Sequence, residues 1–502
     1  MRTFWTRVRT SDPRMSVIVT EDNGPGRIVA LGDERLLHDR QSGDRVESLD
    51  NVFVTPGFWD SHVHLLDYGR SFRYLRVPFH GDADDILVAV REETHRRPRG
   101  SWIIGRGFNR GGFRREPRMS ALEGAAQGHP VLLLSWDHHT AWVNRTALVR
   151  LGLPTSEAGR TGILRESRAF WAYERALEED GQAIDLADDV RVAVRRLAKQ
   201  GLVGVTAIEG EAGLEAIQRV VSEERRLRVQ VFLRADAAPK YWLEGHVLPS
   251  DAWWFTVLGI KLFMDGALGS RTAWMKQPYQ DSTHVGLPQL DPATLRRWLA
   301  EAWQHQQVVA IHAIGDQALH QTIQVLEEMN VGLSPRGRYT RIEHAQLIDD
   351  EDLARLERLP VALSMQPVHL FHDRHLADRY WGSRARHAFR ARDAVARGLR
   401  VVFGSDAPVA SADITAGLWA AVHRADDGES AWYPQQRLGP GDAIDAYTRV
   451  PAQVDARPSG ILEPGHWADL TLWSDDPYEA LERKARDRLM VVGTIVGGRR
   501  VD

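Results

Sequence analysis

Residues 52–65 read VFVTPGFWDSHVHL, an apolar segment that ends in an aspartate and two histidines. In a β-strand, residues two positions apart point to the same face, so His62 and His64 would present their imidazoles side by side. Imidazole is a favoured ligand of zinc and similar divalent ions. The stretch therefore predicts a strand with a metal site at its C-terminal end, although two exposed loop histidines would show the same spacing.

Three more side chains able to bind a metal stand at the ends of apolar segments farther along the chain. His312 lies in VVAIHAIGD, His344 closes RYTRIEH and Asp406 follows VVFGS. Taken singly, each histidine could be a buried core residue, and Asp406 could cap a helix. Barrel enzymes place their active residues at the C-terminal ends of parallel strands, so the positions together favour one metal site.

The middle of the chain alternates strand-like and helix-like segments, which is typical of βα units around a parallel sheet. Helices are expected at Pro292–His305, Gln317–Met329 and Asp349–Arg358. Eight strands are expected, the number that an α/β fold of the (β/α)8 TIM-barrel type requires. They lie near Val52–Asp60, Leu202–Ile208, Val229–Arg234, Phe255–Met264, Val308–Ala313, Tyr339–His344, Val361–Gln366 and Val401–Gly404.

Both ends of the chain carry short strand-like segments instead, among them SVIVT at 16–20 and ADLTLW at 468–473. We expect residues 1–53 and 458–502 to form one small β-sandwich domain, and residues 54–457 to form the barrel. The gap between the first two barrel strands is much longer than a βα unit needs. It predicts a large insertion at about residues 66–200 that covers the active site.

Lysine is rare in this chain, which has five lysines among 64 basic residues. Lys261 lies in the apolar stretch WFTVLGIKLFMDG, where burying a free ammonium group is costly. A lysine that snorkels from a strand end is one explanation. Arginine cannot be deprotonated, whereas a neutral lysine can add carbon dioxide. A lysine kept here therefore favours a carbamate, a carboxylated ligand able to bridge two metal ions.

The composition excludes several classes of protein. The chain has 502 residues, 43% hydrophobic and 26% charged, and its formal net charge of −4 lacks the basic character of a nucleic-acid-binding protein. It contains no cysteine, which excludes disulfides, thiolate metal sites and a cysteine nucleophile. No signal-peptide pattern and no apolar run of membrane-spanning length is present. We expect a cytoplasmic protein with a small-molecule substrate and no nucleic-acid or membrane partner. The sequence leaves open whether two copies of the chain form a homodimer.

Five motifs, in chain order, resemble the amidohydrolase superfamily: VTPGFWDSHVHL, GIKLFMDGALGSRTA, VVAIHAIGD, RIEHAQLI and VVFGSDAPV. SWIIGRGFN at 101–109, HTAWVN at 139–144 and DGALGSRTA at 265–273 resemble the subfamily that includes N-substituted formamide deformylases, amidohydrolase family 3. ILEPGHWADLTLW at 461–473 is similar to the segment in which chains of that superfamily leave the barrel and re-enter the small β-domain. The resemblance spans nearly the whole chain.

The resemblance implies a metal centre with zinc as the expected metal and two ions as the expected number, although the superfamily also contains members with one ion. His62 and His64 would bind the more buried ion. Asp406 would bind the same ion and act as the general base.

The second ion would be held by His312 and His344, and Lys261, as a carbamate derived from CO2, would bridge the two ions. Some subgroups of the superfamily carry a glutamate or a cysteine in place of the lysine. Because this chain has no cysteine, Glu166 and Glu209 are the alternative bridges.

Four residues are expected to contact the substrate. His139 would donate to the substrate carbonyl or serve a structural role, and Arg271 would hold a substrate carboxylate or lock its loop by a salt bridge. Asp265 shares that loop, and Gln366 ends the segment ALSMQ, where it would face the pocket. Three histidines of a polar, helix-like segment are expected at the surface instead: His369, His372 and His375.

The function that the resemblance implies is metal-dependent hydrolysis of a C–N bond in an amide, an N-substituted formamide or a cyclic amide. A metal ion would acidify water and polarise the carbonyl, and Asp406 would carry the proton to the leaving nitrogen. Hydrolysis of an ester, lactone or phosphotriester, or a deamination, would use the same scaffold. A non-catalytic scaffold is a remote alternative, because all six expected ligand positions are filled.

Overall fold

The computed structural model describes residues 1–50, 52–77, 81–109, 113–136, 139–180, 185–243, 253–280, 282–426 and 428–502. Eight strands form one parallel sheet in the order β18-β17-β16-β15-β14-β13-β12-β6, which confirms the predicted barrel. They are β6 (Phe58–Val63), β12 (Leu202–Glu209), β13 (Arg228–Arg234), β14 (Phe255–Phe263), β15 (Val308–Ala313), β16 (Thr340–His344), β17 (Val361–Met365) and β18 (Arg400–Phe403).

The sheet closes on itself between its first and last strands. The backbone N–H of Asp406 donates to the carbonyl of His62 at 2.7 Å, and that of His64 donates to the carbonyl of Ala407 at 2.8 Å. Val63 also forms a parallel bridge with Ala407. These bonds lie at the C-terminal ends of β6 and β18, so closing the barrel brings the first histidine motif next to Asp406.

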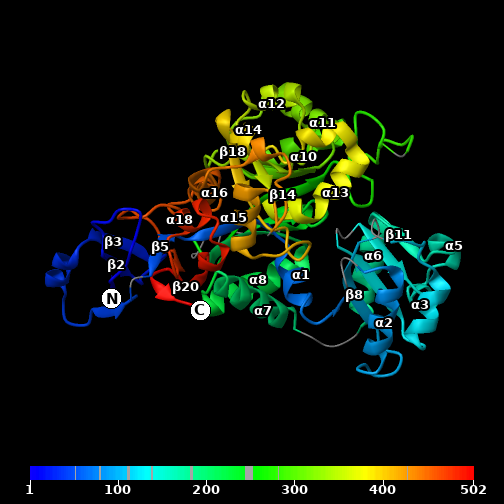
Figure 1. Ribbon diagram of the computed structural model, residues 1–502, viewed down its shortest axis with the longest axis horizontal. Helices are drawn as coiled ribbons and strands as arrows, with labels where there is room; N and C mark the ends of the chain where they lie inside the picture. Colours follow the sequence, from blue (N-terminus) through cyan, green and yellow to red (C-terminus); the bar gives the residue numbers. More distant parts are fainter. Residues whose placement is uncertain are drawn as a thin grey trace.

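Helices surround the barrel strands (Figure 1), and the three predicted helices are confirmed to within two residues at each end. Asp291 caps α10, because its side chain accepts a hydrogen bond from the N–H of Thr294 at 2.9 Å. The helices are α1 (Leu65–Arg70), α7 (Leu186–Lys199), α8 (Glu211–Glu224), α9 (Ala238–Leu243), α10 (Pro292–Gln304), α11 (Asp316–Glu328), α12 (Asp350–Leu356), η3 (Pro367–His369), α13 (Leu370–Trp381), η4 (Gly382–His387), α14 (Ala391–Ala396), α15 (Ile414–His423), η5 (Pro434–Gln436), α16 (Pro440–Asp445) and α17 (Arg449–Val454).

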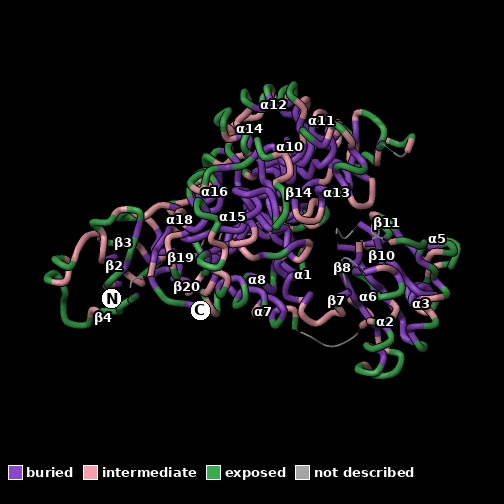
Figure 2. The backbone as a smooth tube through the Cα atoms, in the orientation of Figure 1, coloured by how far each residue is buried: buried purple, intermediate pink, exposed green. Residues whose placement is uncertain are grey.

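The barrel strands are apolar along most of their length because helices remove the sheet from water. All residues of β12, β15 and β17 are buried. Figure 2 shows the buried backbone gathered in the barrel, with exposure on the outer turns. Within the described ranges, no helix combines the length and the hydrophobicity needed to cross a membrane.

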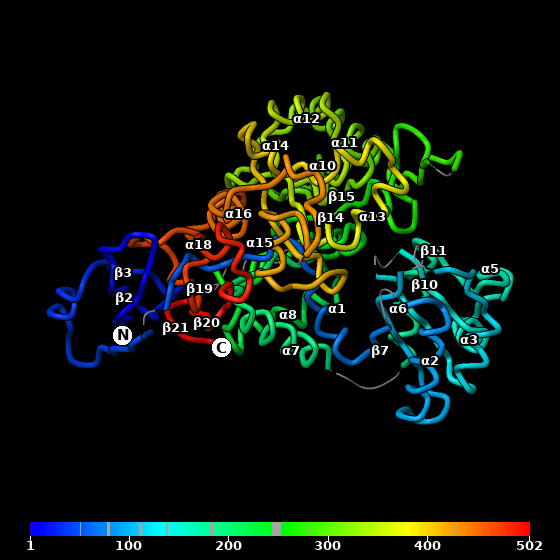
Figure 3. The backbone as a smooth tube through the Cα atoms, viewed as in Figure 1, coloured from blue at the N-terminus to red at the C-terminus, as the bar shows by residue number. Residues whose placement is uncertain are grey.

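The two chain ends build two four-stranded sheets on the same side of the barrel (Figure 3), with the orders β3-β2-β1-β4 and β21-β20-β19-β5. Strands from both ends contribute to one apolar cluster that includes Trp5, Ile18, Leu470 and Ile495. The elements are β1 (Arg2–Thr6), β2 (Val17–Glu21), β3 (Arg27–Gly32), η1 (Glu34–Asp39), β4 (Arg45–Ser48), β5 (Phe53–Pro56), β19 (Leu470–Trp473), α18 (Pro477–Glu482), η6 (Arg486–Arg488), β20 (Val491–Val496) and β21 (Arg499–Arg500).

The expectation of one strand over Val52–Asp60 was wrong, because two strands occupy this segment. β5 pairs with β19 in a terminal sheet, and β6 begins the barrel at Phe58. Gly57 separates them, and its N–H donates to the carbonyl of Asp469 at 2.8 Å. A Cβ atom at this position would lie 2.5 Å from the side chain of Val203, so only glycine fits where the chain passes between the sheets.

The insertion folds around its own five-stranded sheet, in the order β11-β10-β9-β8-β7 (right side of Figure 1). The flanking helices α1 and α7 belong to the barrel core, which includes Leu65 and Val190. The folded body of the insertion is therefore shorter than the expected 66–200. Its elements are β7 (Leu75–Arg76), α2 (Ala83–Thr94), β8 (Ile103–Phe108), α3 (Met119–Ala126), β9 (Val131–Ser135), β10 (Thr140–Val143), α4 (Arg145–Arg150), α5 (Thr155–Ala158), β11 (Ile163–Arg165) and α6 (Ser167–Glu179).

Candidate metal centre

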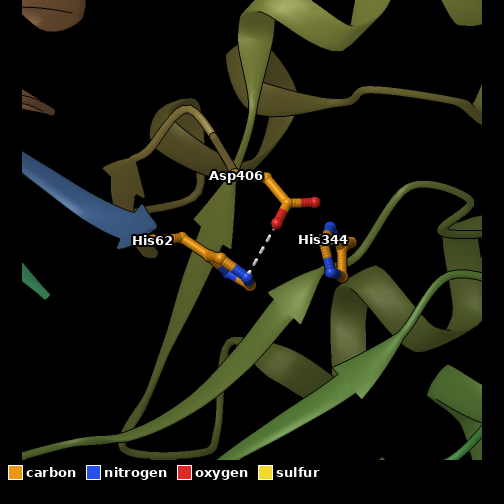
Figure 4. Close-up of side chains that lie close together, drawn as sticks. All are labelled: His62, His344 and Asp406. Atoms are coloured by element: carbon orange, nitrogen blue, oxygen red, sulfur yellow. Dashed lines mark ion pairs between the residues drawn. The ribbon is translucent and has the colours of Figure 1, made fainter. Parts of the chain in front are cut away.

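Three side chains from three strand ends meet in a buried cluster (Figure 4). His62 lies on β6, His344 ends β16 and Asp406 follows β18. One ligand atom from each residue lies within 4.8 Å of the other two, and the residues are 1%, 5% and 6% exposed. Two imidazoles and a carboxylate at this spacing form a donor set that suits zinc or a similar divalent ion.

Asp406 is the member of the cluster that contacts both histidines of the first motif. Its Oδ1 atom lies 3.3 Å from Nε2 of His62 and 3.2 Å from Nε2 of His64, which is partly exposed. Burial alone would raise the pKa of Asp406. The positive charge of His62 and the close approach of the His64 imidazole outweigh burial and hold that pKa well below its usual range. The carboxylate is therefore ionised and available to bind a cation.

Two members of the cluster hold a left-handed backbone, with φ of +69° at His344 and +59° at Asp406. Residues other than glycine rarely adopt this conformation, which costs on the order of 1–3 kcal/mol. At Asp406 it accompanies the hydrogen bond that closes the barrel onto His62. Backbone strain gathered at one cluster supports its interpretation as a functional site.

Outer hydrogen bonds orient both imidazoles. Nδ1 of His62 lies 2.6 Å from Oε2 of Glu343, and Nδ1 of His344 lies 2.8 Å from Oε1 of Gln366. Both bonds use Nδ1 and leave Nε2 for a metal, an arrangement that metal-binding histidines commonly show. Gln366 is expected to contact the substrate, but here it holds His344 and is absent from the described residues that line the cavity.

Glu343 is a functional residue that the sequence interpretation missed. It is fully buried, and its Oε1 atom lies 2.9 Å from Nε of Arg341. Burial favours a higher pKa for Glu343, but Arg341 and His62 outweigh burial and hold the pKa below its usual value. A signal was present in the strand TRIEH, because a glutamate cannot be buried in an apolar strand without a partner.

Lys261 and His312 line the same cavity as the cluster. Lys261 is 1% exposed, which confirms its predicted burial, and its Nζ atom has no hydrogen-bond partner among the described residues. Burial lowers the pKa of Lys261 to about 8. Nε2 of His312 lies 2.9 Å from the carbonyl oxygen of Gly266, and its ring centroid lies 4.5 Å from that of His344.

The insertion contributes His139 to this cavity. Nδ1 of His139 lies 2.7 Å from Oε2 of Glu166, and that oxygen also accepts a hydrogen bond from Gln289. Glu209 lies on the barrel side, where it accepts the N–H of Leu66 at 3.1 Å and burial raises its pKa to about 8. Both glutamates lie outside the cluster of possible metal ligands.

Asp265 and Arg271 lie in the loop after β14, and neither is among the described residues that line the cavity. Asp265 is completely buried and accepts the backbone N–H groups of Ile314 at 3.1 Å and Gly315 at 2.8 Å, so it shapes the loop. The guanidinium carbon of Arg271 lies 5.3 Å from the ring centroid of Tyr380, in a second cavity. Their contacts with substrate stay predictions.

The expectation that His369 lies at the surface was wrong. His369 is 4% exposed on η3, and its Nε2 atom lies 3.8 Å from Oδ2 of Asp406. Trp136 of the insertion contacts its ring edge, with the centroids 6.1 Å apart. His375 is exposed as predicted, and His372 is partly buried. The polar helical pattern concealed the 3-10 turn that directs His369 inward before the helix begins.

The cluster opens into a cavity of about 1040 Å³. Strand ends of the barrel supply its polar lining, and the insertion adds aromatic side chains, Trp136, Phe170 and Trp171. Cavities that bind small molecules commonly measure ~300–1,000 Å³ and combine an apolar lining with a few polar groups. This cavity therefore has the size and lining of a site for an organic molecule.

The sequence profile of the amidohydrolase family matches residues 45–502. The Bacillus subtilis (strain 168) protein YtcJ is 28% identical over 529 residues, which cover 99% of this chain and 97% of that protein. The N-substituted formamide deformylase of Arthrobacter pascens is 24% identical, with 98% and 96% covered. The crystal structure of an uncharacterized metal-dependent hydrolase from Pyrococcus horikoshii OT3 matches with a TM-score of 0.79 at 26% identity, over 95% of this chain and 98% of that one. The chain belongs to the amidohydrolase family.

Proposed function

We propose that this protein is a metal-dependent hydrolase of C–N bonds in amides, N-substituted formamides or cyclic amides. The observation that carries the proposal is the buried cluster of His62, His344 and Asp406, which opens into a large cavity. Membership of the amidohydrolase family supports hydrolysis. Similarity to a formamide deformylase over nearly the whole chain supports the C–N bond as the target.

The side chains fit a divalent metal. Oδ1 of Asp406 is buried and accepts no hydrogen bond among the described residues, and such an atom is costly unless a cation or a donor satisfies it. The available donors are imidazole nitrogens and a carboxylate, which suit zinc. Two zinc ions per chain would be held by six residues: His62, His64, Lys261, His312, His344 and Asp406.

A divalent ion supplies a Lewis acid that polarises a carbonyl group and lowers the pKa of water. Asp406 would accept the proton of the attacking water at a carboxylate oxygen and return it to the leaving nitrogen, so that the amine departs neutral. Glu343 and Gln366 hold two imidazoles in place, which limits reorganisation during the reaction. His139 would donate a hydrogen bond to the substrate carbonyl from the insertion, with its ring centroid 6.1 Å from that of His312.

Lys261 would bridge the two ions as a carbamate. Its neutral amine would attack carbon dioxide, forming an N–C bond and releasing one proton, so that the side chain gains a carboxylate. Support for this role comes from its buried Nζ atom, which has no hydrogen-bond partner among the described residues and stands at a strand that lines the cavity. A permanently charged ammonium group would be costly in that position.

Metal analysis and a substrate screen test the proposal together. Protein purified without chelator should hold close to two divalent ions per chain. It should hydrolyse N-formyl or N-acyl amines, and chelation should abolish this activity until zinc is added back. A reproducible value near one ion, unchanged by zinc and bicarbonate, would refute the binuclear centre. Activity confined to lactones, esters or aminohydrolase substrates would refute the C–N bond as target, and no metal-dependent turnover would refute the hydrolase.

Replacing Lys261 tests the carbamate. Lys261→Ala should bind less metal and be nearly inactive, and Lys261→Arg should do no better, because a guanidinium cannot take up a carboxylate. A short carboxylic acid added with excess zinc should restore part of the activity of Lys261→Ala. The control is Lys240→Ala, which removes an exposed lysine and should leave metal content unchanged. Full metal binding by Lys261→Ala would refute the bridge.

A further inference from the structure

A second cavity, of about 240 Å³, has five arginines in its lining. The insertion, the loop after β14 and α13 each contribute to it. Among the described residues that line it, one carries a carboxylate, Glu116, and five carry guanidinium groups: Arg114, Arg115, Arg165, Arg271 and Arg379. Five guanidinium groups and one carboxylate give this lining an excess of positive charge, which favours a negatively charged occupant.

Two of the guanidinium groups are held on one ring. The Cζ atoms of Arg271 and Arg379 lie 5.3 Å and 5.2 Å from the ring centroid of Tyr380. Tyr380 is 4% exposed, and its carbonyl accepts the N–H of Gln280 at 3.0 Å, so the platform is fixed. Arg271 also has a left-handed backbone, with φ of +59°. One aromatic ring therefore holds two guanidinium groups at the cavity wall, and one of the two residues has a strained backbone.

We propose that this cavity binds a small polyanion, a molecule that carries a phosphate or at least two carboxylate groups. The planar guanidinium fork matches carboxylate and phosphate oxygens and forms paired hydrogen bonds with them. The volume of about 240 Å³ far exceeds the ~10–15 Å³ that one water needs on the same measure, so a small organic anion fits. Binding would bring the arginines of the insertion and of the barrel onto one ligand.

The anion site adjoins the metal centre through two segments. Gly269 lines both cavities, and its loop includes Gly266, whose carbonyl contacts His312. Arg165 directly precedes Glu166, whose carboxylate contacts His139. The occupant is therefore either the anionic end of the substrate or a separate anion that stabilises the two segments. Both would present anionic oxygens to the arginines, and kinetics with a pair of substrates distinguishes them.

Direct binding tests the site without reference to catalysis. Isothermal titration of the metal-loaded protein with inorganic phosphate or succinate at constant ionic strength should show one saturable site per chain. The affinity should weaken as salt is added, because the attraction is electrostatic. The double variant Arg271→Gln/Arg379→Gln should lose at least tenfold in affinity. It should retain metal, because neither residue lines the metal cavity.

The matched control removes two exposed arginines that stack on aromatic rings elsewhere. Arg400 lies over Tyr339 and Arg297 over Trp298, and Arg400→Gln/Arg297→Gln changes the net charge equally. It should bind phosphate and succinate as wild type does. The proposal fails if wild-type protein shows no saturation up to about 10 mM, tenfold above a millimolar Kd. It also fails if the Arg271/Arg379 variant binds normally, or if binding disappears only in Asp406→Asn, which would place the anion on the metal centre.

A pair of substrates identifies the source of the anion, and this comparison alone rests on the proposed hydrolase activity. The pair is an amide that turns over and its analogue with an added terminal carboxylate. If the substrate supplies the anion, the carboxylated form should show a lower KM in wild type, and Arg271→Gln/Arg379→Gln should remove that advantage. If both forms show equal KM while phosphate or succinate still binds, the ligand is a separate anion, which equally supports the site.

Discussion

Asp406 takes part both in the closure of the barrel and in the cluster of possible metal ligands. Its backbone N–H closes the barrel onto His62, and its side chain reaches both histidines of the first motif. The left-handed backbone at this position favours a residue such as Asp or Asn, which tolerates positive φ. Asparagine is therefore the substitution that separates the proton-accepting role from the structural one.

Asp406→Asn should fold nearly normally and lose kcat by ~10²–10⁴, the usual range for removal of a general base. The amide keeps an oxygen near the metal ligands but cannot accept a proton at that position. The measurement is kcat at saturating substrate, with the thermal unfolding midpoint and the metal content as checks on structure. Activity within a few-fold of wild type would exclude Asp406 as the base.

His369→Ala should reduce kcat/KM by roughly tenfold to a hundredfold, which corresponds to the ~1.5–3 kcal/mol of a hydrogen bond to a charged group. Its Nε2 atom is buried, lacks a hydrogen-bond partner among the described residues and lies 3.8 Å from Oδ2 of Asp406 in the large cavity. His369→Gln, which keeps a donor, should recover part of the loss.

The control for this variant is His375→Ala, which removes an exposed histidine of the same segment. It should have wild-type kinetics. Equal effects of His369→Ala and His375→Ala would show that His369 only packs against Trp136 and plays no part in the reaction.

At this scale, the sequence predicts those side chains whose position follows from a strand. His62, His344 and Asp406 could be anticipated because apolar segments end at them and parallel strands end at one rim. His369 could not, because its inward position depends on a single 3-10 turn between β17 and α13. The buried strand TRIEH indicates that Glu343 needs a partner, but the closed barrel decides that this partner is His62.

Among the elements, the barrel strands were predictable because burial by helices demands continuous apolar runs, as in β15. The division of Val52–Asp60 into the two strands β5 and β6 could not be predicted, because it depends on the close approach of Val203 to Gly57. The sheet of the insertion was also missed. Its strands β8 and β9 are as apolar as barrel strands, but their partners in the sheet are set by tertiary contacts.

The insertion brings His139 to the wall of the large cavity, one residue before β10 begins. His139→Ala should lower kcat by about 10²–10³, the usual effect of removing a donor to a developing oxyanion. Metal content should not change, because His139 lies outside the cluster of possible ligands. The measurements are steady-state kinetics and metal analysis of the same preparation.

His95→Ala is the control for the insertion, since His95 is an exposed histidine at the end of α2. It should leave both kinetics and metal content unchanged. Loss of metal in His139→Ala would mean that the insertion supplies a metal ligand and that the ligand set given above is incomplete.

Across the whole molecule, one buried ion pair fastens the terminal sheets to the N-terminal end of the barrel. Arg228 begins β13, and its Nε atom lies 2.7 Å from Oδ2 of Asp469, next to β19. Its guanidinium is stacked between the rings of Trp254 and Trp467, with centroids 4.4 Å and 4.1 Å away. Asp469 also accepts the N–H of Gly497 at 2.9 Å. The pair therefore links barrel, sheet and C-terminal hairpin in one network.

Arg228→Met should lower the free energy of unfolding by about 3–5 kcal/mol, because it leaves Asp469 as a buried charge without its partner. Methionine keeps an apolar chain between the two tryptophans, so loss of packing contributes little. Arg228→Met/Asp469→Asn should recover a large part of the stability, since no uncompensated charge remains. Urea unfolding followed by tryptophan fluorescence measures all three proteins. The control Arg449→Ala breaks the exposed pair with Asp445 and should cost less than ~1 kcal/mol. If the double variant is no more stable than Arg228→Met, packing of the guanidinium between the rings, rather than its charge, joins the sheets to the barrel.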